Sequence, residues 1–155
     1  MIATKATGAN PNERRSGSTF VTMTVGRQLC GVPVLSVRDI IETRAMTRIP
    51  LAPQDIVGCL NLRGRVVTAI DLRLRLHLPP QDVGQTRMSV VVEHQDELYS
   101  LVVDSVQEVI DFQDQCLEPN PATLGSPWRE FSAGVYQLQA ELLIALNIER
   151  VLTFA

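Results

Sequence analysis

The feature that most constrains the fold of this chain is an internal repeat. Residues 21–42 (VTMTVGRQLCGVPVLSVRDIIE) align without a gap on residues 90–111 (VVVEHQDELYSLVVDSVQEVID), at an offset of 69 residues. A second block, VVTAIDLRLRL (66–76), aligns on LLIALNIERVL (142–152) at an offset of 76. Two blocks that recur in the same order, with the extra residues confined to a Pro-rich stretch, predict two copies of one small module.

Both copies show the pattern of β-strands, with turn residues at Gly26-Arg27 and at His94-Gln95-Asp96. The segment 34–43 also fits a helix, because its apolar residues lie at i, i+3, i+6 and i+7, so its type stays open. The expected strands are Phe20–Val25, Gln28–Val34 and Arg65–Ile70 in the first copy, and Met88–Glu93, Glu97–Val103, Val106–Ile110, Gly134–Gln137 and Leu142–Leu146 in the second.

Each copy closes on a polar residue that can cap a short helix, Asp71 before LRLRL and Asn147 before IERVL. Five or so short strands per copy, with turns at close intervals, predict small barrels that remove their own sheet edges. We therefore expect an all-β fold of two tandem five-stranded β-barrels with short closing helices. Residues 18–155 would form one domain of two intertwined subdomains, about 18–86 and 87–155, after a flexible tail at 1–17.

Charge and composition argue against several other classes of protein. The net charge is −3 and the pI about 5.4, whereas nucleic-acid-binding surfaces normally carry a basic excess. No apolar run approaches the roughly 18 residues that a membrane-spanning helix needs, so we expect a soluble chain. The three cysteines are widely spaced and lack a C-x-x-C pair, which favours a reduced, cytoplasmic compartment over a disulfide framework or a zinc site.

One stretch carries a family resemblance. RIPLAPQDIVGCLNLRGRVVTAIDLRLRL (48–76) resembles the signature of the bacterial chemotaxis coupling proteins of the CheW family: Ile-Pro, a glycine, an Asn-Leu-Arg-Gly hairpin and an Asp-Leu-Arg helix start. SLVVDSVQEVI and LLIALNIERVL continue the resemblance, which covers residues 18–154. Thr68-Ala69 departs from the pattern where the family often has a proline, and residues 126–129 have no match in it.

The resemblance implies two SH3-like barrels without catalytic activity, cofactor or metal. It also implies a scaffold that couples methyl-accepting chemoreceptors, through their cytoplasmic tips, to the regulatory domain of the histidine kinase CheA. Further CheW copies are possible partners, whereas nucleic acid and direct membrane insertion are not expected. The place of action would be the cytoplasm, at membrane-associated receptor arrays. The output stays open between flagellar chemotaxis and another response such as surface motility.

Arg63 is the first candidate site residue. An arginine at a hairpin end is usually only solvated, but Gly64 allows a tight turn that holds Arg63 out for a bidentate pair with a partner carboxylate. The resemblance implicates this position in receptor and kinase coupling. Gly58 is the second candidate: its repeat counterpart Gly134 indicates a shared need for close backbone approach, and the resemblance places Gly58 on the receptor-binding side.

The segment that leads between the copies supplies the other candidates. Composition favours a core role for Val37, whereas the resemblance places it beside a groove that could receive an amphipathic receptor helix, with Asp39 at the polar rim. Pro50, Leu51 and Ile56 are expected to face the kinase, because Pro-interrupted segments often form surface connections. The expected receptor-binding set is Val37, Asp39, Gly58, Arg63, Val32, Leu35 and Val102.

Two rival classes remain at this point. An enzyme would need a reactive constellation, and neither His77 nor His94 has a partner at ligand spacing, although Asp104, Asp111 and Asp114 could in principle converge. A small-barrel nucleic-acid module would need a basic groove with stacking aromatics, and aromatic residues make up only 5% of the chain.

Overall fold

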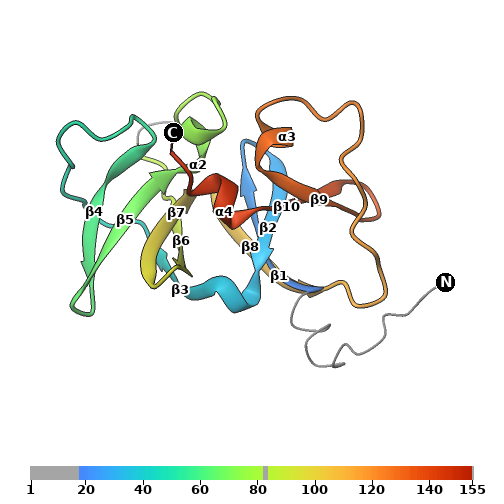
Figure 1. Cartoon of the computed structure of the whole chain (residues 1–155), viewed down its shortest axis with the longest axis horizontal. Coiled ribbons are helices and arrows are strands. Elements are labelled where there is room, and N and C mark those ends of the chain that lie inside the picture. The colour runs from blue at the N-terminus through green and yellow to red at the C-terminus, as the bar shows by residue number, and fades with distance from the viewer. Residues whose placement is uncertain (1–17, 82–83, 155) are drawn as a thin grey trace.

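The computed structural model describes residues 18–81 and 84–154, so the expected tail at 1–17 lies outside the described residues. The described chain forms strands with short helices between them (Figure 1). The strands are β1 (Thr19–Val25), β2 (Gln28–Pro33), β3 (Val37–Glu42), β4 (Ile56–Leu62), β5 (Arg65–Asp71), β6 (Met88–His94), β7 (Glu97–Val103), β8 (Ser105–Asp111), β9 (Ser132–Gln137) and β10 (Leu142–Leu146). The helices are the 3₁₀ turn η2 (Val34–Ser36), α2 (Leu72–Arg75), α3 (Trp128–Phe131) and α4 (Ile148–Val151).

The strands form two five-stranded sheets, which lie side by side in Figure 1. Sheet A has the order β8-β1-β2-β10-β9, and sheet B has the order β3-β6-β7-β5-β4. Because the repeat makes β1–β5 equivalent to β6–β10, the two orders are the same order of equivalent strands. Each sheet combines the first two strands of one copy with the last three strands of the other copy. Sheet A contains β1 and β2 with β8, β9 and β10, and sheet B contains β6 and β7 with β3, β4 and β5. The boundary near residue 86 therefore separates the sequence copies, and the sheets do not follow it.

The hairpin turns form as expected, because both central residues of each take positive φ. Gly26 and Arg27 have φ of 58° and 71°, and Gln95 and Asp96 have 51° and 65°. Such turns match the right-handed twist of the strands that they join. The open question at 34–43 is resolved as a single 3₁₀ turn followed by a strand, and β4, absent from the expected strands, forms along the segment 56–62.

The predicted caps are confirmed at both closing helices. The Asp71 carboxylate accepts a hydrogen bond from the Arg73 N–H at 2.9 Å, and the Asn147 side chain accepts one from the Arg150 N–H at 3.1 Å. Each cap satisfies a backbone donor that has no partner within its helix. The same local device thus ends both copies of the repeat.

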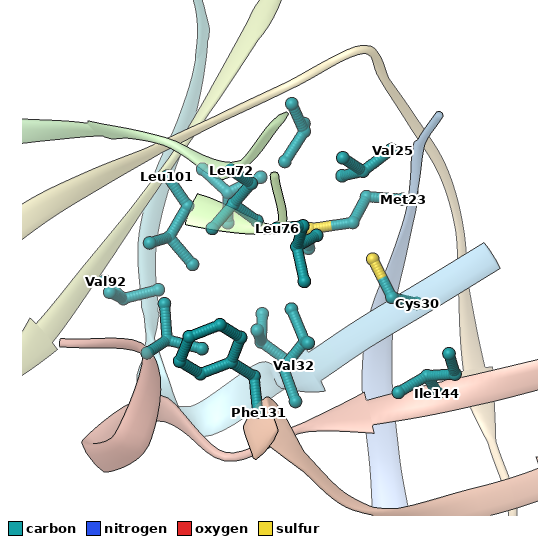
Figure 2. Close-up of a cluster of buried hydrophobic side chains, with 14 of the residues drawn as sticks. Met23, Val25, Cys30, Val32, Leu72, Leu76, Val92, Leu101, Phe131 and Ile144 are labelled. Carbon is teal, nitrogen blue, oxygen red and sulfur yellow. The ribbon is translucent and has the colours of Figure 1, made fainter. Parts of the chain in front are cut away.

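The main core lies between the sheets and draws side chains from both (Figure 2). Met23 and Val32 reach it from β1 and β2, while Leu72 and Leu101 reach it from α2 and β7. Two smaller apolar clusters lie one inside each sheet, and each includes side chains from both edge strands of its sheet. That arrangement fits the barrel form, because edge strands must approach each other to share one cluster. None of the described helices has the length and hydropathy that crossing a membrane requires.

Candidate functional site

In the Asn-Leu-Arg-Gly hairpin between β4 and β5, residues 61–64, each residue has a different structural role. The Asn61 side chain accepts a hydrogen bond from the Gly64 N–H at 3.0 Å and so shapes the turn. Leu62 is 8% exposed and enters the apolar cluster inside sheet B. Arg63 and Gly64 take φ of 53° and 87°, which closes the hairpin between Leu62 and Arg65. The turn therefore anchors a buried leucine and presents an arginine beside it.

Arg63 and Asp39, both predicted site residues, meet in this structure. The Arg63 Nη2 atom lies 3.2 Å from the Asp39 Oδ2 atom, with the Arg63 side chain 79% exposed and that of Asp39 21% exposed. The other Asp39 oxygen accepts the Ile40 N–H at 2.9 Å, so the carboxylate has a fixed orientation. The Asp39 Oδ2 atom is itself buried and has no hydrogen-bond partner among the described residues, so Arg63 is the charge that faces it. Because Arg63 is 79% exposed, the pair adds roughly 0–1 kcal/mol to stability, and the other N–H groups of the guanidinium stay available to a carboxylate on a partner.

These residues border a depression of about 230 Å³ at the end of sheet B, which we call the B mouth. Its floor is apolar and its rim is charged. The floor consists of Leu62, Val91 and Leu98, and the rim of Arg38, Asp39, Arg63, Arg65 and Glu93.

The rim carries three arginines against two carboxylates and is therefore net positive. Glu93 lies 3.3 Å from Arg38 and 3.6 Å from Arg65, so it holds both guanidinium groups at the edge of the depression. Arg38, Arg65 and Glu93 are not among the site residues predicted from the sequence. The signal that could have found them is the register of β3, β6 and β5, which brings three separate stretches of chain to one end of the sheet.

Gly58 serves a close backbone approach. A Cβ atom there would lie 2.7 Å from the Thr47 carbonyl oxygen and 3.0 Å from the Met46 Cβ. Thr47 and Cys59 exchange two backbone hydrogen bonds, of 2.9 and 2.8 Å, across this point. Gly134 repeats the arrangement, because a Cβ there would lie 2.7 Å from the Glu118 carbonyl oxygen. Both glycines thus let a returning segment pair with an edge strand.

The other expected receptor-binding residues separate into two groups. Leu35, on η2, is 63% exposed, and Val37, the first residue of β3, is half-buried and packs against the main core. Val32 and Val102 require a correction, since they are 0% and 1% exposed. Their side chains alternate inward on central strands and pack in the interior, so they line no accessible wall.

The expected kinase-facing residues lie within residues 48–57, which comprise the end of the connection between β3 and β4 and the first two residues of β4 and which we call the loop 48–57. Leu51 is fully exposed, has φ of 61°, and stands at the tip of this loop. Pro50 is exposed beside it, and Ile56 is half-buried against the main core at the base of the loop. A shallow depression of about 710 Å³ runs along the same loop. A single exposed leucine is common, but here the three consecutive residues Ile49, Pro50 and Leu51 are all exposed and apolar. Contiguous apolar surface of this kind is a candidate contact surface.

The carboxylates considered for an enzyme do not converge. Asp104 is engaged by Arg73, whose Nε and Nη2 atoms each donate to it at 2.7 Å, and by the Gly26 N–H at 2.9 Å. Burial alone would raise the pKa of Asp104, but these hydrogen bonds and the charges of Arg73 and Arg87 hold that pKa below its ordinary value. Asp111 instead accepts from the Ser18 hydroxyl and the Gln113 N–H. Across residues 18–81 and 84–154, no group of side chains has the arrangement of a metal site.

Comparison with known proteins gives a consistent result. Residues 19–155 match the family model described as the CheW-like domain. The chain is 26% identical over 145 residues to the chemotaxis protein CheW of Helicobacter pylori, covering 94% of this chain and 87% of that protein. It is 28% identical over 137 residues to the chemotaxis protein CheW of Klebsiella aerogenes, covering 88% of this chain and 82% of that protein.

The fold matches a solved structure as well. The crystal structure of the scaffolding protein TtCheW from Thermoanaerobacter tengcongensis superposes with a TM-score of 0.75 at 25% sequence identity. The superposition covers 84% of this chain and 89% of that one.

Proposed function

The chain belongs to the CheW-like domain family of non-catalytic chemotaxis scaffolds, and from this premise we propose which of its surfaces meets which partner. The family links chemoreceptors to the kinase CheA. In this chain, the B mouth with Leu35 and Val37 contacts the helical cytoplasmic tip of a receptor, and the loop 48–57 contacts the regulatory domain of CheA. The scaffold acts in the cytoplasm, recruited to receptor arrays at the membrane.

The observation that carries the receptor assignment is the Asp39–Arg63 pair above an apolar floor. A receptor tip offers apolar side chains at helical spacing with charged residues beside them. Leu35 and Val37 provide apolar contact, while the net positive rim favours an acidic flank on the helix. Gly58 acts here through the backbone, because the segment 46–47 that it admits leads from β3 to the loop 48–57.

The kinase assignment rests on Leu51. Its fully exposed side chain at a loop tip, with Ile49 37% exposed beside it, gives a compact apolar projection that a pocket on a partner can enclose. Burying a leucine side chain contributes about 1.5–3 kcal/mol. Micromolar affinity corresponds to about 8.2 kcal/mol, so one such anchor would be a large share of the binding free energy.

Calorimetric titration of the full chain against a receptor-tip fragment and, separately, against a CheA regulatory domain tests both assignments. We expect Arg63→Ala to weaken receptor binding about tenfold, which is about 1.4 kcal/mol, with less effect on the kinase. Arg27→Ala is the matched control, because Arg27 is also an exposed arginine at positive φ in a two-residue hairpin turn. Receptor binding that survives Arg63→Ala unchanged would remove the B mouth from the receptor surface.

Leu51→Ser is the corresponding test of the kinase surface. We expect it to weaken binding to the regulatory domain about tenfold or more and to leave receptor binding unchanged. Val109→Ser is the control, since Val109 is a 56% exposed apolar residue on sheet A. Equal effects of the two substitutions would place the kinase elsewhere on the molecule.

A further inference from the structure

Sheet A carries a depression at the position that the repeat makes equivalent to the B mouth. It measures about 300 Å³, and we call it the A mouth. Seven of its eight lining residues align with lining residues of the B mouth at the repeat offsets. Leu29 and Leu138 take the places of Leu98 and Leu62 on the floor. The two depressions are therefore the same architectural feature, once in each sheet.

The rims of the two mouths carry opposite charge. Gln107 and Gln139 stand where the B mouth has Arg38 and Arg63, and Glu141 stands where it has Arg65. The acid at the Asp39 position is kept, as Glu108. Glu93 is replaced by Thr24, so the A mouth is lined by two carboxylates and no basic residue.

Neither carboxylate of the A mouth is neutralised by the chain itself. Glu108 and Glu141 are both exposed, and none of the ion pairs among the described residues includes either of them. The Thr22 hydroxyl donates to the Glu108 backbone oxygen at 2.5 Å, which fixes the backbone and leaves the carboxylate free. In the B mouth the equivalent carboxylate is met by Arg63 at 3.2 Å.

We propose that the A mouth is a docking site for an arginine side chain of a partner protein, carried on a segment with a neighbouring aliphatic residue. The guanidinium group pairs with Glu108 and Glu141, and the aliphatic side chain covers Leu29 and Leu138. The B mouth is the internal model for this contact, because there the chain's own Arg63 takes the equivalent place. Arginine fits better than lysine, since its planar fork can bridge two carboxylates. This site is separate from the receptor and kinase surfaces proposed above.

The test uses the full ¹⁵N-labelled chain and a capped synthetic peptide, Ala-Leu-Arg-Leu-Ala, followed by NMR. We expect saturable amide shifts confined to the residues that line the A mouth, on β1, β2, β8 and the turn between β9 and β10. The same peptide with citrulline in place of arginine keeps the shape and loses the charge, and we expect it to bind at least fivefold more weakly. Equal binding of the two peptides, or shifts scattered over the surface, would overturn the proposal.

Two variants locate the contact. Gln139→Arg supplies a counterpart of Arg63 within the chain, and we expect it to occupy Glu108 and abolish the shifts without loss of stability. Glu108→Gln should weaken binding at least fivefold, whereas Asp114→Asn, which removes one exposed negative charge outside the mouth, should not. Equal weakening by these two variants would show that net charge alone attracts the peptide. No receptor or kinase is present, so this result does not depend on the adaptor role.

Discussion

The two sheets share one strand order and differ in what fills them. Inside sheet A, Phe20, Phe112 and Tyr136 form an aromatic cluster, with the Phe112 and Tyr136 rings stacked at 4.1 Å and the Phe20 ring edge-on to both. The repeat places Ser89, Thr43 and Leu60 at the equivalent positions of sheet B. The same backbone arrangement is thus filled in sheet A by three rings and in sheet B by two small hydroxyl side chains and one leucine.

The same asymmetry appears at the connections between the second and third strands of each copy. In one, Leu35 is 63% exposed on η2. In the other, the equivalent residue is Asp104, which is clamped by Arg73 and the Gly26 backbone. The clamped connection leads into sheet A, and the open connection leads into sheet B beside the B mouth. The aromatic rings and the clamped connection therefore belong to sheet A, whereas the exposed Leu35 lies at the entry to sheet B.

Removal of an aromatic ring from sheet A should have the largest effect on stability and should separate the two sheets most clearly. Phe20→Ala leaves a cavity inside sheet A, and we expect it to lower the free energy of unfolding by about 3–5 kcal/mol. At the equivalent place in sheet B, Ser89→Ala removes one hydrogen bond to Thr43 and should cost about 0.5–1.5 kcal/mol. Urea denaturation of both variants measures the difference. Similar losses would mean that the aromatic cluster is not the stronger of the two small cores.

The clamp should be the next largest effect and should depend on pH. Asp104→Asn removes charge-assisted hydrogen bonds, and we expect a loss of about 1.5–3 kcal/mol at neutral pH. Because folding lowers the pKa of Asp104, this stabilisation is fully present above the unfolded pKa of about 3.9 and disappears as the pH falls through the lower folded value. Unfolding measured from pH 7 to pH 2 should therefore show the two proteins converging only at the acid end. A constant gap would exclude the carboxylate charge as its cause.

Gly58 and Gly134 test a feature that the two sheets share, the close approach of a returning segment to an edge strand. Gly58→Ala and Gly134→Ala each bring a Cβ against a carbonyl oxygen at 2.7 Å, so we expect a similar loss of about 1–3 kcal/mol from each. Thermal unfolding of the two variants measures both losses. Gly125→Ala is the control, since a Cβ there meets nothing within 4 Å. A loss from only one of the two variants would show that the two glycines have the same geometry but do not contribute equally to stability.

The smallest expected effect on stability belongs to Arg63. Arg63→Ala removes a 79% exposed arginine from its pair with Asp39 and should change the free energy of unfolding by less than about 1 kcal/mol, whatever it does to partner binding. Denaturation in low and high salt measures this, because screening weakens exposed pairs. A larger loss would give the pair a structural role in sheet B.

The sequence predicted the local parts of the fold well, because those depend on neighbouring residues. Turns at Gly26-Arg27 and caps at Asp71 and Asn147 follow from side chains within a few positions. The sequence did not predict whether a strand pairs with strands of its own copy or of the other copy, because equivalent strands of the two copies have similar patterns of apolar residues. Val32 and Val102 were misplaced for a similar reason: inward and outward positions of a central strand are both apolar in a chain with a core on each face of its sheets.

The candidate site was only partly foreseeable. Asp39 and Arg63 were both expected at the receptor side from the family resemblance, and their direct pairing is visible only once β3 and the β4–β5 hairpin meet at one end of sheet B. Arg38, Arg65 and Glu93 come to the same rim from three strands. Convergence of this kind depends on long-range register, which a single sequence does not encode in any local pattern.

Strand exchange between the copies has a consequence for the synthesis of the chain. Sheet A needs β1 and β2 from the start of the domain and β8, β9 and β10 from its end. During synthesis on the ribosome, β1 and β2 therefore remain unpaired with β8 and β10 until almost the whole chain has emerged. Such distant pairings slow folding, and they leave apolar strands exposed in the interval. We expect the nascent chain to depend on chaperones until its last strand is released, and a message truncated before β10 to yield no half-folded scaffold that could occupy a place in an array.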